Sequence, residues 1–191
     1  MQRPDEKKRQ KITATAAKLF ATRPFHEVRL DDVAAAAQVG KGTLYIYFKS
    51  KEDLYRSLIH DGVMQIMEQL SQSITNDLSP GDALEKTIRL MVTFAYAHPY
   101  LFELMRAIDS FKGRESLLPA RRQLIGFIEQ VLRRGADQQS WTDPHPQLTA
   151  VFIPGLIRSA ILYGPKDIKE KALADQILRL FRHGLQKETF R

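Results

Sequence analysis

Apolar residues recur every three to four positions along almost the whole chain, and no stretch alternates apolar and polar residues as a half-buried strand would. In residues 6–22, for example, Ile12, Ala16, Leu19 and Phe20 fall on one face of a helix. Proline, glycine and polar clusters interrupt the pattern at short intervals. We therefore predict an all-α protein of about nine helices, which cover approximately residues 6–22, 31–38, 41–48, 51–72, 80–97, 99–110, 114–136, 146–163 and 167–187.

Capping residues and prolines mark several of these helix ends. Ser79 and Pro80 are the residue types typical of an N-cap and of the first helical position. Ser50 is followed three residues later by an acid, as in a capping box. Because proline has no backbone N–H, Pro119 is expected to trim or kink the first turn of its helix, and Pro154 is expected to kink another helix from inside.

The composition is ordinary for a soluble globular protein, with 43% hydrophobic and 27% charged residues. The chain has no run of 18 apolar residues and begins with a polar, charged segment, so we expect neither a membrane span nor a secretory signal. The absence of cysteine excludes disulfides and cysteine metal sites. We therefore expect a cytoplasmic protein with no membrane partner, no metal and no cofactor.

Most of the positive charge lies in the first third of the chain. The formal net charge is +7, and residues 1–59 hold 12 Lys and Arg against 7 Asp and Glu, whereas the remaining 132 residues have a net charge of only +2. A basic segment favours association with an anionic partner, although it says nothing about the fold.

Residues 31–48 have the packing pattern of a helix-turn-helix. Val33, Ala34 and Ala37 are small apolar residues, and small side chains let two short helices cross closely. Leu44 and Phe48, four positions apart, give the following helix one buried face.

The opposite face of that helix is polar. Ammonium and hydroxyl groups there can donate to phosphates and reach base edges in a major groove. Gly40 and Gly42 are expected to bracket the turn that leads into it. The face displays Lys41, Thr43, Tyr45 and Tyr47.

Residues 36–54, Ala-Ala-Gln-Val-Gly-Lys-Gly-Thr-Leu-Tyr-Ile-Tyr-Phe-Lys-Ser-Lys-Glu-Asp-Leu, resemble the helix-turn-helix signature of TetR-type regulators, and the upstream Ala16–Phe20 resembles the end of that family's first helix. The resemblance covers about a third of the chain. It implies a three-helix DNA-binding domain at 6–66, with the helix-turn-helix motif at about 29–48. It also implies a larger helical domain at 67–191 that binds a ligand and dimerises.

The resemblance implies a homodimeric repressor that a small molecule releases from a palindromic operator in double-stranded DNA. Thr43, Tyr45, Tyr47 and Lys51 stand where the family contacts DNA. Gly40 stands where the family often has serine. The predicted DNA-binding residues are Arg29, Lys41, Gly42, Thr43, Tyr45, Tyr47, Lys49 and Lys51.

Several of these residues also have structural interpretations that involve no DNA contact. Arg29 stands where the family often has threonine, and it either contacts a phosphate or is a solvated surface charge. Tyr45 or Tyr47 could be partly buried, since tyrosine burial is commonly intermediate. The whole basic region could be the solvated face of a helical bundle.

The last two predicted helices are apolar over a wide arc, which favours pairing with a second copy into a four-helix interface. The alternative is that these residues form only the core of one chain. The predicted interface residues are Phe152, Gly155, Leu156, Ser159, Ile177, Leu178, Phe181 and Leu185.

Methionine and aromatic residues of the C-terminal region favour a small hydrophobic effector, either aromatic, acyl or a toxic hydrophobe. For any single residue, ordinary core packing is the simpler interpretation, and His98 before Pro99 also fits a helix cap. The predicted pocket residues are Met64, Met67, Phe94, His98, Phe102, Met105, Phe127 and Phe152.

Catalysis has no support in the sequence. We find no Gly-x-Ser-x-Gly nucleophile motif, no phosphate-binding glycine-rich loop and no His-Glu-x-x-His motif. Asp31 and Asp32 form an acid pair at a helix start, where the helix dipole explains them. Besides the ligand-released repressor, two functions stay open: a same-fold activator or partner-controlled regulator, and a helical lipid carrier or scaffold.

Overall fold

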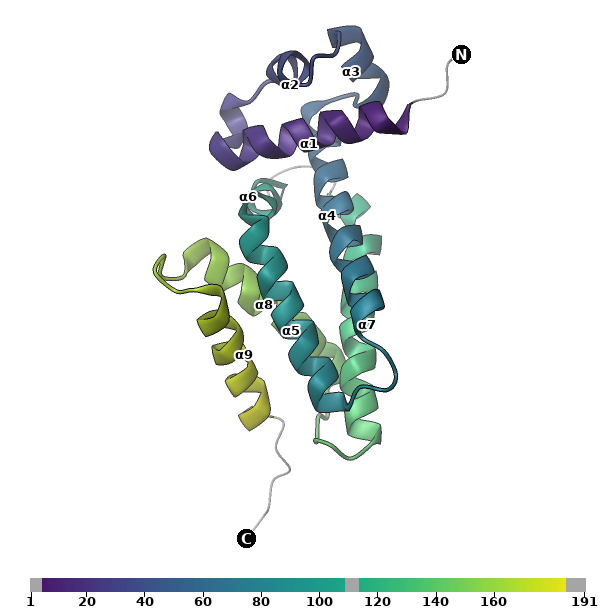
Figure 1. The fold of residues 1–191 in the computed structure, drawn as a ribbon, viewed down its shortest axis with the longest axis vertical. Coiled ribbons are helices and arrows are strands. Elements are labelled where there is room, and N and C mark those ends of the chain that lie inside the picture. The colour runs from purple at the N-terminus through teal and green to yellow at the C-terminus, as the bar shows by residue number, and fades with distance from the viewer. Residues whose placement is uncertain (1–4, 109–113, 185–191) are drawn as a thin grey trace. The chain divides into compact units, whose positions relative to one another are not determined.

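The computed structural model describes residues 5–108 and 114–184, and this part of the chain is helical with no strand (Figure 1). The predicted all-α fold is thus confirmed. Nine α-helices and two short 3₁₀ turns occur in these residues. Their bounds are α1 Glu6–Thr22, 3₁₀ turn Phe25–Glu27, α2 Leu30–Ala36, α3 Lys41–Tyr47, α4 Lys51–Ser73, α5 Pro80–Ala97, α6 Pro99–Ile108, 3₁₀ turn Arg114–Leu117, α7 Leu118–Asp137, α8 Pro146–Tyr163 and α9 Glu170–Gly184.

The helix ends follow the local chemistry of the sequence. Ser79 caps α5 as predicted, because its Oγ accepts a hydrogen bond from the Asp82 backbone N–H at 3.1 Å. Pro119 acts as expected: the residues before it form a 3₁₀ turn, and α7 begins only at Leu118. α8 continues through Pro154, so the kink expected there stays a prediction.

Several details differ from the sequence-based prediction, among them the second helix, which ends at Ala36 rather than at residue 38. The 3₁₀ turn at Phe25–Glu27 was not expected. The last helix begins at Glu170 rather than near residue 167, because Lys166 and Asp167 form a turn after Pro165. The predicted ends of the sixth and ninth helices, at 110 and 187, lie outside the described residues.

The chain divides into two compact units. The first comprises residues 1–62 and 99–117, and the second comprises residues 63–98 and 118–191. α4 contributes residues to both units, whereas α6 belongs to the first. Within the first unit a Cβ on Gly62 would lie 2.5 Å from a methyl carbon of Leu101, so glycine lets α4 and α6 approach closely. These units differ from the functional domains 6–66 and 67–191, which stay a proposal.

The first unit buries the apolar stripe of α1 against the helix-turn-helix. Ile12 and Ala16 are fully buried, and Phe20 packs edge-on against Tyr55 of α4 with ring centroids 4.6 Å apart. Val33 and Leu44 close this core from α2 and α3. The core therefore fixes which faces of the two short helices stay outside.

In the second unit α5 packs against α7, α8 and α9. Its buried residues, among them Ile88 and Val92, repeat with helical period. Trp141 covers the end of α7, where its indole N–H donates to the Leu132 carbonyl at 3.1 Å. Arg134 donates to the backbone carbonyl of Leu78 at 3.0 Å and so holds the α4–α5 connection.

Within the described ranges, no helix has the length and apolar character needed to cross a membrane. The same residues contain no group of three or more His, Asp or Glu side chains arranged to hold a metal ion.

Candidate nucleic-acid interface

The turn between α2 and α3 is made by Gln38, not by the glycines that the sequence suggested. Gln38 has φ 53°, in the left-handed region. The Gln38 N–H donates to the Ala35 carbonyl, and the Val39 N–H donates to the Ala34 carbonyl, both at 3.0 Å. This is the Schellman arrangement that ends a helix and reverses the chain. Gly40 is the extended N-cap residue of α3.

One face of α3 is buried, as predicted, whereas the predicted open face is only partly exposed. Leu44 and Phe48 are 0% and 2% exposed and hold the helix on the core. Thr43 is half-buried in the first turn. Tyr45 is exposed, and a Cβ added to Gly42 would meet no atom within 4 Å. Gly42 thus leaves room for the close approach of another backbone.

Ile46 is a candidate contact that the sequence analysis missed. Its side chain is 61% exposed, more than that of Tyr45 at 39%. The search for hydroxyls and cations passed over it, although it lies four positions after Gly42 and so shares the open face of α3. An exposed aliphatic side chain on such a face can contact a thymine methyl group.

Lys41 is exposed, but its ammonium group is engaged. Lys41 Nζ lies 2.9 Å from Asp31 Oδ2, so the first turn of α3 is tied to the first turn of α2. The hydrogen bond and the charge of Asp31 raise the pKa of Lys41 above its ordinary value. The pair lowers the net positive charge on the exposed surface of α3.

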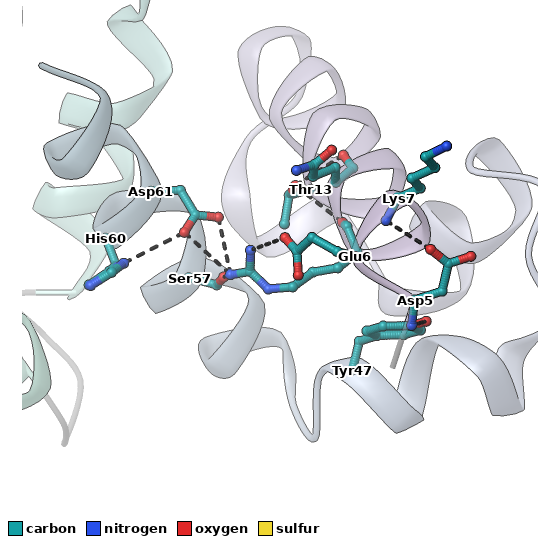
Figure 2. Close-up of polar contacts among 10 residues, drawn as sticks. Asp5, Glu6, Lys7, Thr13, Tyr47, Ser57, His60 and Asp61 are labelled. Atoms are coloured by element: carbon teal, nitrogen blue, oxygen red, sulfur yellow. Dashed lines mark hydrogen bonds and ion pairs between the residues drawn. The ribbon is translucent and has the colours of Figure 1, made fainter. Parts of the chain in front are cut away.

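Tyr47 is half-buried, as one alternative for the two tyrosines allowed. Its hydroxyl accepts a hydrogen bond from the Asp5 backbone N–H at 2.8 Å (Figure 2). This bond joins the last residue of α3 to the N-cap residue of α1. The Tyr47 side chain is thus less exposed than its assignment as a DNA contact implied.

The start of α4 follows α3 directly and is capped as expected. Ser50 Oγ accepts from the Asp53 backbone N–H at 3.1 Å, while Asp53 Oδ2 accepts from the Lys49 backbone N–H at 2.9 Å. Lys49 is exposed and its Nζ donates to the Tyr45 carbonyl at 3.2 Å. Lys51, the first residue of α4, is half-buried, and desolvation lowers its pKa.

Arg29 lies at the N-cap of α2 with an exposed side chain. Its backbone N–H donates to Asp32 Oδ2 at 3.0 Å, so the residue supports the helix start through its main chain. The predicted DNA-binding residues thus lie on α3, at the start of α4 and at the start of α2.

An exposed stripe runs along α8 in the second unit. Phe152 and Tyr163 are 55% and 72% exposed. The stripe repeats every three to four positions, so its members share one helix face. It consists of Leu148, Phe152, Gly155, Leu156, Ser159 and Tyr163.

The α9 part of the predicted interface needs correction. Ile177 and Leu178 are 2% and 4% exposed, so they belong to the core of one chain and offer almost no area to a partner. Leu180, another apolar residue of the same helix, is 52% exposed. Phe181 is buried but still lines a groove, and Leu185 lies outside the described residues. The groove, of about 590 Å³, is lined by Thr149, Val151, Phe152, Gly155, Leu156, Leu180 and Phe181.

The eight predicted ligand-pocket residues do not belong to one unit. Phe102 and Met105 lie in the first unit and the other six in the second. Phe94 and Phe102 are core residues, at 8% and 9% exposed. Met64 is 42% exposed.

Among the remaining four, Met67 and Phe127 are half-buried, and Phe152 lines the α8–α9 groove. His98 is the C-cap residue of α5. Its ring stacks on Phe94 at 4.2 Å, and its Nδ1 lies 3.0 Å from the Phe94 carbonyl, as the helix-cap alternative expected. The grouping of all eight side chains into one ligand pocket stays a prediction.

Comparisons with known proteins agree with this architecture. The family model for bacterial regulatory proteins of the tetR family matches residues 12–58. The HTH-type transcriptional regulator RutR of Escherichia coli O157:H7 is 30% identical over 166 residues, which cover 75% of this chain and 78% of RutR.

Two solved structures share the fold over nearly the whole chain. FadR from Bacillus subtilis, solved in complex with stearoyl-CoA, has a TM-score of 0.81 and 20% identity, and the match covers 93% of this chain and 99% of that one. A tetR-family regulatory protein from Rhodococcus RHA1 has a TM-score of 0.82 and 17% identity, covering 95% and 98%.

The chain belongs to the TetR family of bacterial regulatory proteins. It is a DNA-binding transcriptional regulator with a helix-turn-helix, formed here by α2 and α3. The family consists of transcriptional regulators rather than enzymes.

Proposed function

We propose that the protein is a homodimeric repressor that binds a palindromic operator through α3 and is released by a hydrophobic acyl ligand. The observation that carries the proposal is the open face of α3, where Tyr45 and Ile46 are exposed beside Gly42 on a helix anchored from behind. A hydroxyl, an aliphatic group and a bare backbone are suited to reading base edges and the thymine methyl group. The cations of Arg29, Lys49 and Lys51 would contact phosphates, which fix register rather than sequence.

A second copy of the chain is the proposed occupant of the α8 stripe. Large apolar side chains are exposed along four turns of this helix and continue into the α8–α9 groove through Leu180. Such a self-complementary face suits a two-fold interface. Two-fold symmetry would place two α3 helices on half-sites separated by roughly 34–36 Å or a multiple of it.

The ligand is proposed from chemistry and from likeness. The second unit has an apolar core, and the stearoyl-CoA complex of FadR has the same fold over 93% of this chain. A ligand can release DNA only through its differential affinity for the DNA-binding and DNA-free conformations. α4 has residues in both units, so it is the element through which such a preference would act.

The DNA part of the proposal is tested by selecting duplexes from a random pool and measuring their affinity across salt concentrations. We expect a palindromic site bound by two protomers, with affinity that falls as salt rises because counterions are released. Tyr45→Ala and Ile46→Ala should weaken the selected site more than random duplex. Equal affinity for all duplexes would contradict sequence-specific recognition.

The ligand part uses stearoyl-CoA, stearate and free coenzyme A as separate probes on the preformed complex. We expect stearoyl-CoA to lower operator affinity by at least tenfold and coenzyme A to have no effect. Release by stearate alone would support a hydrophobic acyl ligand and would show that the thioester is not required. Tighter operator binding in the presence of the thioester would support the activator alternative, and indifference to all three would contradict an acyl effector.

A further inference from the structure

The first turn of α1 is bonded to α3, which carries the candidate DNA surface, and to α4 (Figure 2). On one side the Asp5 backbone N–H donates to the Tyr47 hydroxyl at the end of α3. On the other, Arg9 forms an ion pair with Asp61 of α4 at 3.2 Å and also donates to Ser57 Oγ. Helix ends ordinarily fray, so two tertiary contacts within one turn show that the start of α1 is held in a defined position.

Asp5 uses its side chain and its backbone N–H in separate hydrogen bonds. Its carboxylate Oδ1 caps α1 by accepting from the Lys7 backbone N–H at 2.9 Å, while its own backbone N–H is taken by Tyr47. The neighbouring acid, Glu6, lies 3.6 Å from Arg9 Nη1. Both acids of the first turn are therefore engaged inside the first unit.

The two lysines of the same turn differ from these acids and from Arg9. Lys7 and Lys8 are exposed, and neither ammonium has an ion-pair partner among residues 5–108 and 114–184. Figure 2 shows the Lys7 side chain extending away from Tyr47. These contacts thus hold the backbone of the turn that carries Lys7 and Lys8 beside the last residue of α3.

The length of α3 indicates how far its last residue would lie from the DNA phosphates in the proposed complex. Seven residues make a helix of roughly 10 Å, comparable with the 12 Å width of a major groove. When such a helix lies across the groove, its ends are close to the phosphates on the walls. A cation held beside the last residue of α3 is then within reach of the DNA backbone.

We propose that Tyr47 is a positioning residue that holds the first turn of α1 beside α3, so that Lys7 and Lys8 form an additional phosphate contact. This inference rests on the proposed binding of DNA by α3. The competing role is a direct bond from Tyr47 to a phosphate, which is chemically open because a hydroxyl that accepts one hydrogen bond can still donate another.

The test compares wild type, Tyr47→Phe, Lys7→Gln/Lys8→Gln and the triple variant on the selected operator. We expect the double lysine variant to weaken binding and to reduce the salt slope by about 0.9 for each phosphate that the protein no longer neutralises. Tyr47→Phe keeps the ring and should weaken binding several-fold. In the triple variant the Tyr47 change should add nothing, because its effect passes through the lysines.

Lys18→Gln is the matched control, since it removes an exposed charge from the other end of α1 and should leave the salt slope unchanged. Amide exchange in the first turn of α1 should speed up in Tyr47→Phe while the melting temperature stays the same. Additive losses in the triple variant, or an unchanged slope in the double lysine variant, would overturn the proposal. Failure of wild type to bind any duplex would instead count against the proposed function.

Discussion

At the scale of single residues, we expect the pairing of Lys41 with Asp31 to weaken the proposed attraction of α3 for DNA. Both side chains are exposed, with relative side-chain exposures of 64% and 56%, and exposed ion pairs add little to stability. We therefore expect the pair to affect the proposed DNA binding rather than folding. A carboxylate beside an approaching phosphate costs electrostatic energy, and it competes for the ammonium that would otherwise neutralise that phosphate.

We expect Asp31→Asn to tighten binding to random duplex by several-fold at low salt and to make the salt slope steeper by about 0.9 if Lys41 gains one phosphate. Fluorescence anisotropy with labelled duplex measures both quantities. Asp137→Asn removes the same charge from the end of α7 and should leave DNA affinity nearly unchanged. If the two variants behaved alike, Lys41 would not be restrained by Asp31.

Residue-level chemistry also shows what the sequence could not provide. The buried pair Leu44 and Phe48 was predictable, because a spacing of four leaves one helix face apolar. The left-handed backbone of Gln38 was not, because glycine is the expected residue there and two glycines stand nearby. The hydrogen bond from Asp5 to Tyr47 joins residues 42 apart, which local patterns do not report.

At the scale of elements, α7 carries two glycines with opposite surroundings. A Cβ on Gly135 would lie 1.9 Å from the Trp141 ring, whereas a Cβ on Gly126 would meet nothing within 4 Å. Gly135 thus makes room for Trp141 and for the loop that leads to α8, while Gly126 only adds flexibility to the helix.

We expect Gly135→Ala to lower the free energy of unfolding by about 1–3 kcal/mol through overpacking. Gly126→Ala should raise it by about 0.5–1 kcal/mol, since alanine favours the helix. Urea titration followed by fluorescence measures both, and Trp141 is the single tryptophan of the chain, so the signal reports directly on this contact. An unaffected Gly135→Ala variant with a native spectrum would show that the ring can move aside.

The helix bounds were the most predictable feature of the fold, because proline, serine and glycine determine where a helix starts or ends through local backbone effects. α1, α5 and α8 have the predicted bounds. What the sequence could not separate was the core face of α9 from its outer face. Ile177 and Leu180 are both apolar and three positions apart, yet the first is 2% exposed and the second 52%. The difference arises from packing against α5 and α8, which no local pattern encodes.

At the scale of the whole molecule, two-fold symmetry would multiply the effect of any change on the α8 stripe. In an isologous interface each substitution occurs twice, once on each copy. Burying one large apolar side chain is worth about 1.5–3 kcal/mol, and burying a lysine in its place adds a desolvation cost. One charged substitution on this face should therefore be enough to separate the protomers, while the core of each protomer stays intact because the altered residue is exposed.

We accordingly expect Phe152→Lys and Leu156→Lys to be folded monomers at micromolar concentration, as measured by light scattering and circular dichroism. Their affinity for the full palindrome should fall by at least tenfold, because the α3 helices of two protomers are no longer linked. Their affinity for a single half-site should stay that of wild type. Leu118→Lys introduces the same charge at an apolar residue on α7 that is 39% exposed and should remain dimeric. If Phe152→Lys and Leu156→Lys both stayed dimeric with full operator affinity, the interface would have to lie on another face, since a lysine at the centre of a packed apolar stripe has no path to water.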